Sequence, residues 1–224
     1  VSDVAKIDAL VADVVSKLIA YRLIAPAFGL PDPIRVVCRE DRADKLLAAL
    51  AVHELDMVIS DSPVPPTVHV KAYSHLLGEC GVTFFAAAPL ARTLKRRFPD
   101  ALTGTPMLLP SEGTVLRRQL EDWFQQKALH PTIVGEFDDS ALMKAFGQNG
   151  VGVFVAPSPI GAEVRRQYRV VPIGSTDAVR EKFYAISAER RVKHPGVLAI
   201  AARARLEMGQ DAAEGTRPAP EAGS

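Results

Sequence analysis

The chain has 224 residues, of which 48% are hydrophobic and 24% are charged. These proportions are typical of a packed globular protein, and they exclude a disordered, collagen-like or disulfide-stapled chain. At about 150 residues per domain, the length predicts one bilobed unit or two small domains. The 27 basic and 26 acidic side chains give a formal net charge of +1. The chain therefore lacks the basic excess with which a nucleic-acid-binding domain neutralises several phosphates.

Cysteine usage and hydropathy indicate the compartment. Cys38 and Cys80 lack CxxC spacing and each lies in an apolar run, so we expect two reduced, buried thiols. No apolar run reaches the ~20 residues that span a bilayer, and residues 1–8 lack the basic and apolar regions of a signal peptide. We therefore expect a cytoplasmic location and no contact with a membrane.

The first 60 residues alternate strand-like and helix-like segments. The expected order is strand 7–11, helix 14–24, strand 34–38, helix 42–54 and strand 57–59. Asp13 is predicted to be the N-cap of the first helix. This alternation is typical of a parallel sheet covered by helices.

A second alternating series follows a proline-rich break at 63–66. The apolar stretch 68–85 predicts an extended strand that leaves the first lobe. After it we expect strands at 107–109, 132–134, 151–155, 170–173 and 183–187, and helices at 113–128, 140–148, 161–167 and 197–208. Residues 209–224 lack apolar periodicity and are predicted to be a flexible tail.

The fold class predicted from this order is α/β, with two Rossmann-like lobes joined by a hinge of two crossing strands near 72–85 and 183–190. Residues 1–76 and 190–208 are expected to form lobe I, and residues 77–189 lobe II. The cleft between such lobes lies at the carboxyl ends of both sets of strands, where helix N-termini converge. It suits a small polar or anionic ligand.

Two segments resemble the effector-binding domains of LysR-type transcriptional regulators. Residues 55–59, LDMVI, resemble the segment that ends the third strand of those domains, and residues 141–157 resemble their V-x-x-G-x-G-[IV]-x-x-x-P motif. The order of the lobes extends the resemblance over residues 4–208. Longer strings resemble, more narrowly, the activators of sodium/proton antiporter genes within that family; they lie at 13–22, 34–40, 75–82 and 135–147.

The resemblance implies a fold like that of type 2 periplasmic binding proteins and a regulatory domain that senses a small-molecule or ion effector between its lobes. It implies a homodimer or homotetramer formed through the regulatory domains. DNA would be bound through an N-terminal winged helix-turn-helix domain that this sequence does not contain.

Candidate effector-binding residues lie at strand ends and helix starts. They are Asp13, Val14, Arg39, Asp61, Ser62, Ser111, Glu112, Glu136, Asp138, Asp139, Ser140 and Phe154. Many of them fit a plainer role equally well, as helix caps, turns or surface ion pairs. The turn at 111–114 offers backbone N–H groups to an anion, although Glu112 opposes an anion there.

Three carboxylates, those of Glu136, Asp138 and Asp139, precede the predicted helix at 140–148. Acidic side chains are stabilising at a helix N-terminus, so capping alone accounts for them. The alternative is a hard cation, because such ions prefer carboxylate, hydroxyl and carbonyl oxygens. The subgroup resemblance implies sodium or lithium as the signal, with Glu136 and Asp138 as candidate ligands and Asp61 and Ser62 across the cleft. Protons compete with the ion, so binding would depend on pH. We expect no other cofactor.

The sequence carries no motif for catalysis. GxSxG, P-loop and HExxH patterns are absent, and the glycines at 147, 150 and 152 precede a strand rather than opening a helix. We therefore expect a regulator rather than an enzyme. The alternative is a solute-binding protein of a transport system, whose lobes and crossings are similar. A third alternative, a bilobed deaminase of porphyrin precursors, would need a cysteine in an exposed cleft loop. Neither Cys38 nor Cys80 is predicted to lie in such a loop.

Overall fold

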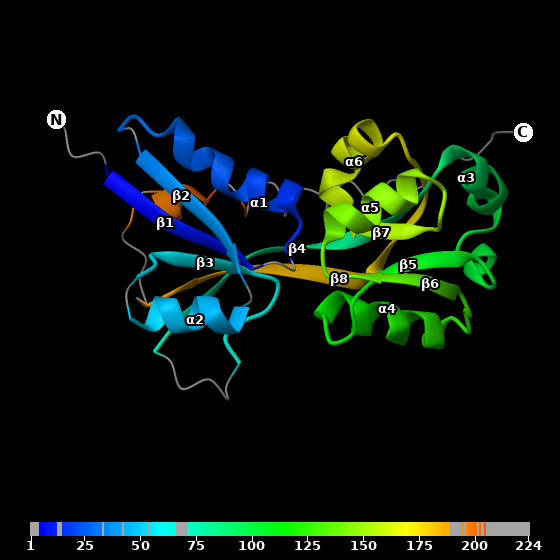
Figure 1. Cartoon of the computed structure of the whole chain (residues 1–224), viewed down its shortest axis with the longest axis horizontal. Coiled ribbons are helices and arrows are strands. Elements are labelled where there is room, and N and C mark those ends of the chain that lie inside the picture. Colours follow the sequence, from blue (N-terminus) through cyan, green and yellow to red (C-terminus); the bar gives the residue numbers. More distant parts are fainter. Residues whose placement is uncertain are drawn as a thin grey trace, which may run out of the picture.

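The computed structural model describes residues 5–12, 15–32, 34–41, 43–52, 54–65, 71–188, 194, 196–200, 202 and 204. Two lobes lie side by side along the long axis of the molecule, and two long strands run between them (Figure 1). Within the described ranges, none of the helices combines the length and apolar character that a membrane span requires.

Lobe I contains a parallel arrangement of strands. Its elements are β1 (Ala5–Ala12), α1 (Lys17–Ile24), the 3-10 helix η1 (Ala25–Gly29), β2 (Ile34–Asp41), α2 (Ala43–Ala51) and β3 (Met57–Ser60). Strand β1 pairs in parallel with β2 on one side and with β3 on the other. Helices α1 and α2 lie on opposite sides of these strands (Figure 1). The predicted alternation of strands and helices is confirmed here.

The start of α1 differs from the prediction. The helix begins at Lys17 with Ser16 as its N-cap, and the Ser16 side chain makes no capping hydrogen bond. Asp13, the predicted cap, lies outside the described residues, as does Val14. The apolar spacing identified the helix but did not fix its first turn.

The two lobes share a ribbon of two long antiparallel strands. Strand β4 (Tyr73–Ala86) pairs with β8 (Val171–Ser187), from Tyr73 opposite Ser187 to Ala86 opposite Val171. Strand β3 of lobe I pairs with one end of β8, and β7 (Phe154–Pro157) pairs with the opposite end of β4. A hydrogen-bonded sheet in the order β2-β1-β3-β8-β4-β7 therefore passes through both lobes.

The crossing strand β8 corrects a prediction. The segments 170–173 and 183–187 were expected to be separate strands, but they are the two ends of β8. Between them the sequence GSTDAVREK is polar, because the middle of the ribbon is partly exposed and needs no continuous apolar run. Register shifts interrupt the β4–β8 pairing at three places.

Lobe II adds a second, smaller group of strands. Its elements are α3 (Ala88–Leu94), β5 (Pro106–Pro110), α4 (Val115–Gln126), β6 (Thr132–Phe137), α5 (Ser140–Gln148), β7 and α6 (Gly161–Tyr168), with 3-10 helices at Lys95–Arg97, Asp100–Leu102 and Ser158–Ile160. Strands β5 and β6 pair in parallel, and Met107 of β5 bridges to Val153 just before β7.

Two helices differ from or extend the prediction. Helix α3 was not predicted. Helical residues at 196–200, 202 and 204 match part of the helix expected at 197–208; the tail at 209–224 lies outside the described residues.

Neighbouring phenylalanines on β4 separate the apolar core into two clusters. Successive side chains of a strand point to opposite faces, so Phe84 packs against Trp123 at 5.4 Å between ring centroids, whereas Phe85 stacks on Phe154 at 5.7 Å.

Cys80 is buried as expected, but Cys38 is exposed on β2. That part of the cysteine prediction is wrong because β2 is an edge strand.

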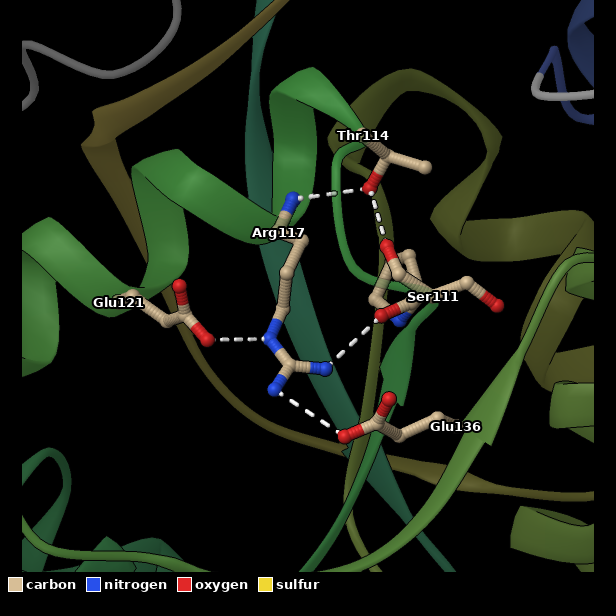
Figure 2. A network of polar contacts seen from close by, with 6 residues as sticks. Ser111, Thr114, Arg117, Glu121 and Glu136 are labelled. Atoms are coloured by element: carbon tan, nitrogen blue, oxygen red, sulfur yellow. Dashed lines mark hydrogen bonds and ion pairs between the residues drawn. The ribbon is translucent and has the colours of Figure 1, made fainter.

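A buried arginine joins helix α4 to the ends of β5 and β6 (Figure 2). Arg117 is 4% exposed. It donates to the carboxylates of Glu121 and Glu136 and, at 3.0 Å, to the carbonyl of Pro110. Burial opposes its charge, yet the two carboxylates hold the pKa of Arg117 above its ordinary value.

We predict that Arg117→Ala lowers the free energy of unfolding by about 2 kcal/mol, because it leaves the Pro110 carbonyl without its donor and opens space under α4. The exposed neighbour Arg118 provides the matched control, and Arg118→Ala should change stability by less than about 0.5 kcal/mol. Urea denaturation of both variants checks this. Equal effects would contradict a structural role for the Arg117 network.

Candidate functional site

A pocket with a volume of about 50 Å³ lies between the lobes. A water molecule occupies about 30 Å³ in the liquid, so the space suits an ion with its waters or a small organic molecule. Its walls come from lobe I, lobe II and the crossing strand β8. The lining residues are Ser16, Asp61, Pro110, Thr114, Leu116, Phe137, Asp138, Ser140, Met143, Lys144, Val155, Pro157 and Glu181.

The polar lining comes from strand ends and helix starts. Asp61 directly follows β3, Asp138 directly follows β6, and Ser140 is the first residue of α5. Thr114 is the N-cap of α4, where its side chain accepts a hydrogen bond from the Arg117 N–H. The carboxyl edge of parallel strands is where α/β proteins gather such groups, and it is where the sequence predicted the cleft.

Lys144 is a buried cation in this pocket. Its side chain is on α5 and the residue is 2% exposed. The Nζ atom donates to the carbonyl and to the hydroxyl of Ser140, at 3.1 and 3.0 Å. Burial lowers the pKa of Lys144 to about 8, against the opposing effect of the acidic Glu181 and Asp139.

Glu181 is a partly buried acidic residue that lines the same pocket. It is on β8, and within the described part of the chain its Oε1 atom is buried without a hydrogen-bond partner. Burial raises the pKa of Glu181 to about 7; Lys144 favours the ionised form and Asp61 opposes it. A buried acceptor without a donor is costly, so this atom points to a ligand that donates a hydrogen bond.

The structure brings some of the predicted site residues together at the pocket. Asp61, Asp138 and Ser140 line it. Asp139 adjoins the lining and caps α5, since its Oδ1 accepts from the Ala141 N–H at 2.7 Å. Of the two roles that the sequence left open for Asp139, the structure shows the helix cap.

Other predicted residues lie away from the pocket. Glu136 is bound to Arg117, so it does not share the space with Asp138 as the candidate cation ligands were expected to. Phe154 is wholly buried under α5, where Gly147 approaches it so closely that a Cβ would lie 2.1 Å from its ring. Among the described residues, no group of three or more His, Cys, Asp or Glu side chains is arranged to hold a metal ion.

The remaining predicted residues are in turns and at the sheet edge. Arg39 and Glu112 are exposed and do not line the pocket. The backbone N–H of Ser62 donates to the hydroxyl of Ser60 at 3.3 Å. The carbonyl of Ser111 accepts from the hydroxyl of Thr114 at 3.1 Å, as part of the turn before α4. These positions serve the fold locally.

Sequence reasoning missed the buried Lys144 and the partly buried Glu181, although each broke a pattern. Lys144 lies on the buried face of α5 together with Met143 and Gly147, where an apolar residue is usual. Glu181 shares one face of β8 with the buried Val179 and Phe183, because side chains two residues apart point the same way. A charge on an apolar face was the available signal.

Two ion pairs connect α1 of lobe I to lobe II beside the pocket. Arg22 pairs with Glu163 at the start of α6, and both side chains are about three-quarters buried. Lys17 lies 3.8 Å from the Asp139 carboxylate and 3.7 Å from that of Glu40. Arg22 lowers the pKa of Glu163 against the opposing effect of burial. In this arrangement, charged contacts of α1 join the two lobes.

Residues 21–208 match the LysR substrate binding domain family. The chain is 38% identical over 190 residues to the "Transcriptional activator protein NhaR" of Escherichia coli K12, and equally to that of Shigella flexneri. The match covers 85% of this chain and 62% of each relative. Both relatives are described as activators of transcription, which agrees with the expectation of a regulator rather than an enzyme.

Solved structures share the fold at low sequence identity. The apo regulatory domain of HypT from Salmonella typhimurium has a TM-score of 0.63 and 16% identity, with 95% of this chain and 98% of that chain covered. The cofactor-binding domain of the Cbl transcriptional regulator has a TM-score of 0.71 and 13% identity, with 91% and 89% covered. The architecture is thus the type 2 periplasmic-binding-protein-like one that was predicted. By sequence and by fold, the chain belongs to the LysR substrate-binding domain family.

Proposed function

We propose that this chain is the effector-sensing regulatory part of a LysR-type transcriptional activator that controls a sodium/proton antiporter gene. The family match supports the regulatory role, and the likeness to NhaR supports the target. The chain spans 62% of the length of those relatives, so DNA binding is assigned to another part of the protein. The place of action is then the cytoplasm, where the gene is.

The observation that carries this proposal is a pocket with walls from both lobes and from the strand that joins them. A ligand that touches Asp61 of lobe I and Asp138 of lobe II makes both contacts at one lobe angle and loses one of them at another. Such a ligand binds the two arrangements with different affinity, and that difference is what shifts the equilibrium between them. The change in angle would reach the DNA through the attached domain.

The simplest effector for the acidic side of the pocket is a sodium or lithium ion. The carboxylates of Asp61, Asp138 and Glu181 line the pocket without being arranged as a three-ligand metal site, and carboxylate oxygens are the ligands that hard cations prefer. The sign of the pH effect follows from Glu181 and Lys144. Above pH about 7 Glu181 is ionised and attracts the ion, and above about 8 Lys144 loses the charge that repels it.

We predict that sodium and lithium chloride raise the melting temperature of the chain more than potassium chloride does at equal ionic strength. A ligand that binds the folded state alone stabilises it. The difference should be larger at a pH above 8 than at a pH below 7, because Glu181 and Lys144 both favour the ion at the higher pH. Thermal unfolding in the three salts measures it. Equal shifts in all three would count against a selective cation site.

We predict that Asp138→Asn removes most of any sodium-specific stabilisation, because it takes a carboxylate from the pocket lining. Glu112→Gln is the matched control, since Glu112 is an exposed carboxylate of the same lobe outside the lining. The same melting experiment compares the two variants. A sodium response that survives Asp138→Asn unchanged would remove this residue from the site.

We also propose that a second copy of the chain covers an apolar groove on lobe I. The groove has a volume of about 630 Å³ and is lined by Val11, Lys17, Ala20, Tyr21, Ile24, Ala25, Phe28, Val36, Cys38 and Glu40. Tyr21 and Phe28 are 70% and 68% exposed there, which is unusual for large apolar groups in a monomer. The edge strand β6 of lobe II also exposes Ile133 and Val134. Antiparallel pairing of two copies would join the two surfaces in a twofold interface.

We predict that Tyr21→Glu shifts the chain from dimer toward monomer, because it places a charge in the buried centre of that interface. Val52→Glu is the control: Val52 is 64% exposed and does not line the groove. Sedimentation velocity over a range of concentrations distinguishes the species. Equal weakening by both variants, or by neither, would place the interface elsewhere.

A further inference from the structure

The acidic side of the interlobe pocket accounts for a positive ligand, but it does not account for Lys144. A buried ammonium group in the same pocket repels a bare cation. Burying such a charge is costly, and the acidic Glu181 and Asp139 offset only part of that cost. A ligand with two opposite charges would use both sides of the pocket.

Lys144 is suited to bind an anionic group. An ammonium group has three N–H donors, and two of them are directed to the carbonyl and hydroxyl of Ser140. Ser140 is the first residue of α5, a helix of nine residues, and a helix N-terminus favours negative charge. The Asp139 carboxylate already caps this helix start, so it is the remaining donor of Lys144 that is left for a carboxylate of the ligand.

Glu181 is suited to bind a cationic donor. Its Oε1 atom is buried without a hydrogen-bond partner in the described structure. Asp61 and Asp138 line the same pocket and add negative charge. An ammonium group of a ligand would supply both the missing donor and the compensating charge.

Apolar side chains form another part of the lining. Leu116, Phe137, Met143 and Val155 face the pocket, so the two charged ends of the ligand would be joined by a small carbon body. A volume of about 50 Å³ limits that body to a few atoms.

We propose that the pocket binds a small zwitterion, with its carboxylate on Lys144 and its ammonium group on Glu181, supported by Asp61 and Asp138. This inference rests on the proposed function in that the pocket is the effector site. Binding of a zwitterion requires the positive charge of Lys144, whereas that charge repels a bare cation.

The pH dependence of the two ligands differs. A zwitterion needs Lys144 charged and Glu181 ionised, so its affinity is greatest between pH about 7 and about 8. The other charged groups around the pair are Asp61 after β3, Asp138 and Asp139 before α5, and Lys17 on α1. A sodium ion gains affinity as Lys144 loses its proton and shows no such maximum.

The experiment is isothermal titration of the full chain with glycine, L-alanine and β-alanine. Ethylammonium chloride and potassium propionate serve as ligands with one charge each. The variants are Lys144→Met and Glu181→Gln, which keep side-chain size, and Lys127→Met is the control on an exposed lysine outside the pocket. Thermal melting of each variant confirms that it folds.

We expect at least one zwitterion to bind more tightly than either single-charge ligand. Its Kd should rise about tenfold or more in Lys144→Met and in Glu181→Gln, as loss of a hydrogen bond to a charged group implies. Lys127→Met should bind as the original chain does. Binding that survives Lys144→Met, or no binding of any zwitterion, would overturn the proposal.

Sodium titrations separate this failure from failure of the proposed function. If sodium binds and Lys144→Met strengthens it, the pocket is an effector site for a bare cation and the zwitterion is excluded. If neither zwitterions nor cations bind, and Asp138→Asn alters no response, the pocket is not the effector site and both proposals fall.

Discussion

The antiparallel pairing of β4 with β8 is the constraint on which the rest of the structure depends. Each strand belongs to both lobes, because β3 adds to one end of β8 and β7 to the opposite end of β4. The lobes are thus held by a shared hydrogen-bonded ribbon and not by a loose linker. Register shifts within the ribbon mark places where its bend differs from that of a regular sheet. A hinge of this kind limits the lobes to changes in mutual angle.

The shape of the interlobe pocket depends on that angle, because its walls come from both lobes and from the ribbon. Glu181 is a residue of the ribbon itself, Lys144 belongs to lobe II, and Asp61 follows the last strand of the lobe I sheet. These charges are costly in an empty pocket and less costly when a ligand pairs with them. Occupancy therefore stabilises the arrangement that brings these three groups to their present separation.

Much of the fold could be predicted from periodicity, and the site only in part. Alternating apolar segments identified the strands and helices of lobe I, and the carboxyl edge predicted Asp61, Asp138 and Ser140 in the lining. The middle of β8 was missed because a partly exposed strand has no apolar run. Phe154 and Glu136 were misplaced because strand-end position does not reveal which way a side chain points; one packs under Gly147 and the other binds Arg117. Tertiary partners of this kind are not encoded in local spacing.

Helix α1 links the pocket to the surface on which we propose that a second copy binds. Lys17 approaches Asp139 beside the pocket and also lines the apolar groove, and Arg22 pairs with Glu163 of lobe II. Surface ion pairs are weak individually, but the Arg22 pair is largely shielded from solvent. A change in lobe angle stretches these contacts and moves α1 relative to lobe II. Since Tyr21 lies between the two basic residues on the same helix, the groove that it lines shifts with them. If both proposals hold, effector binding and assembly are coupled through one helix, without a separate relay.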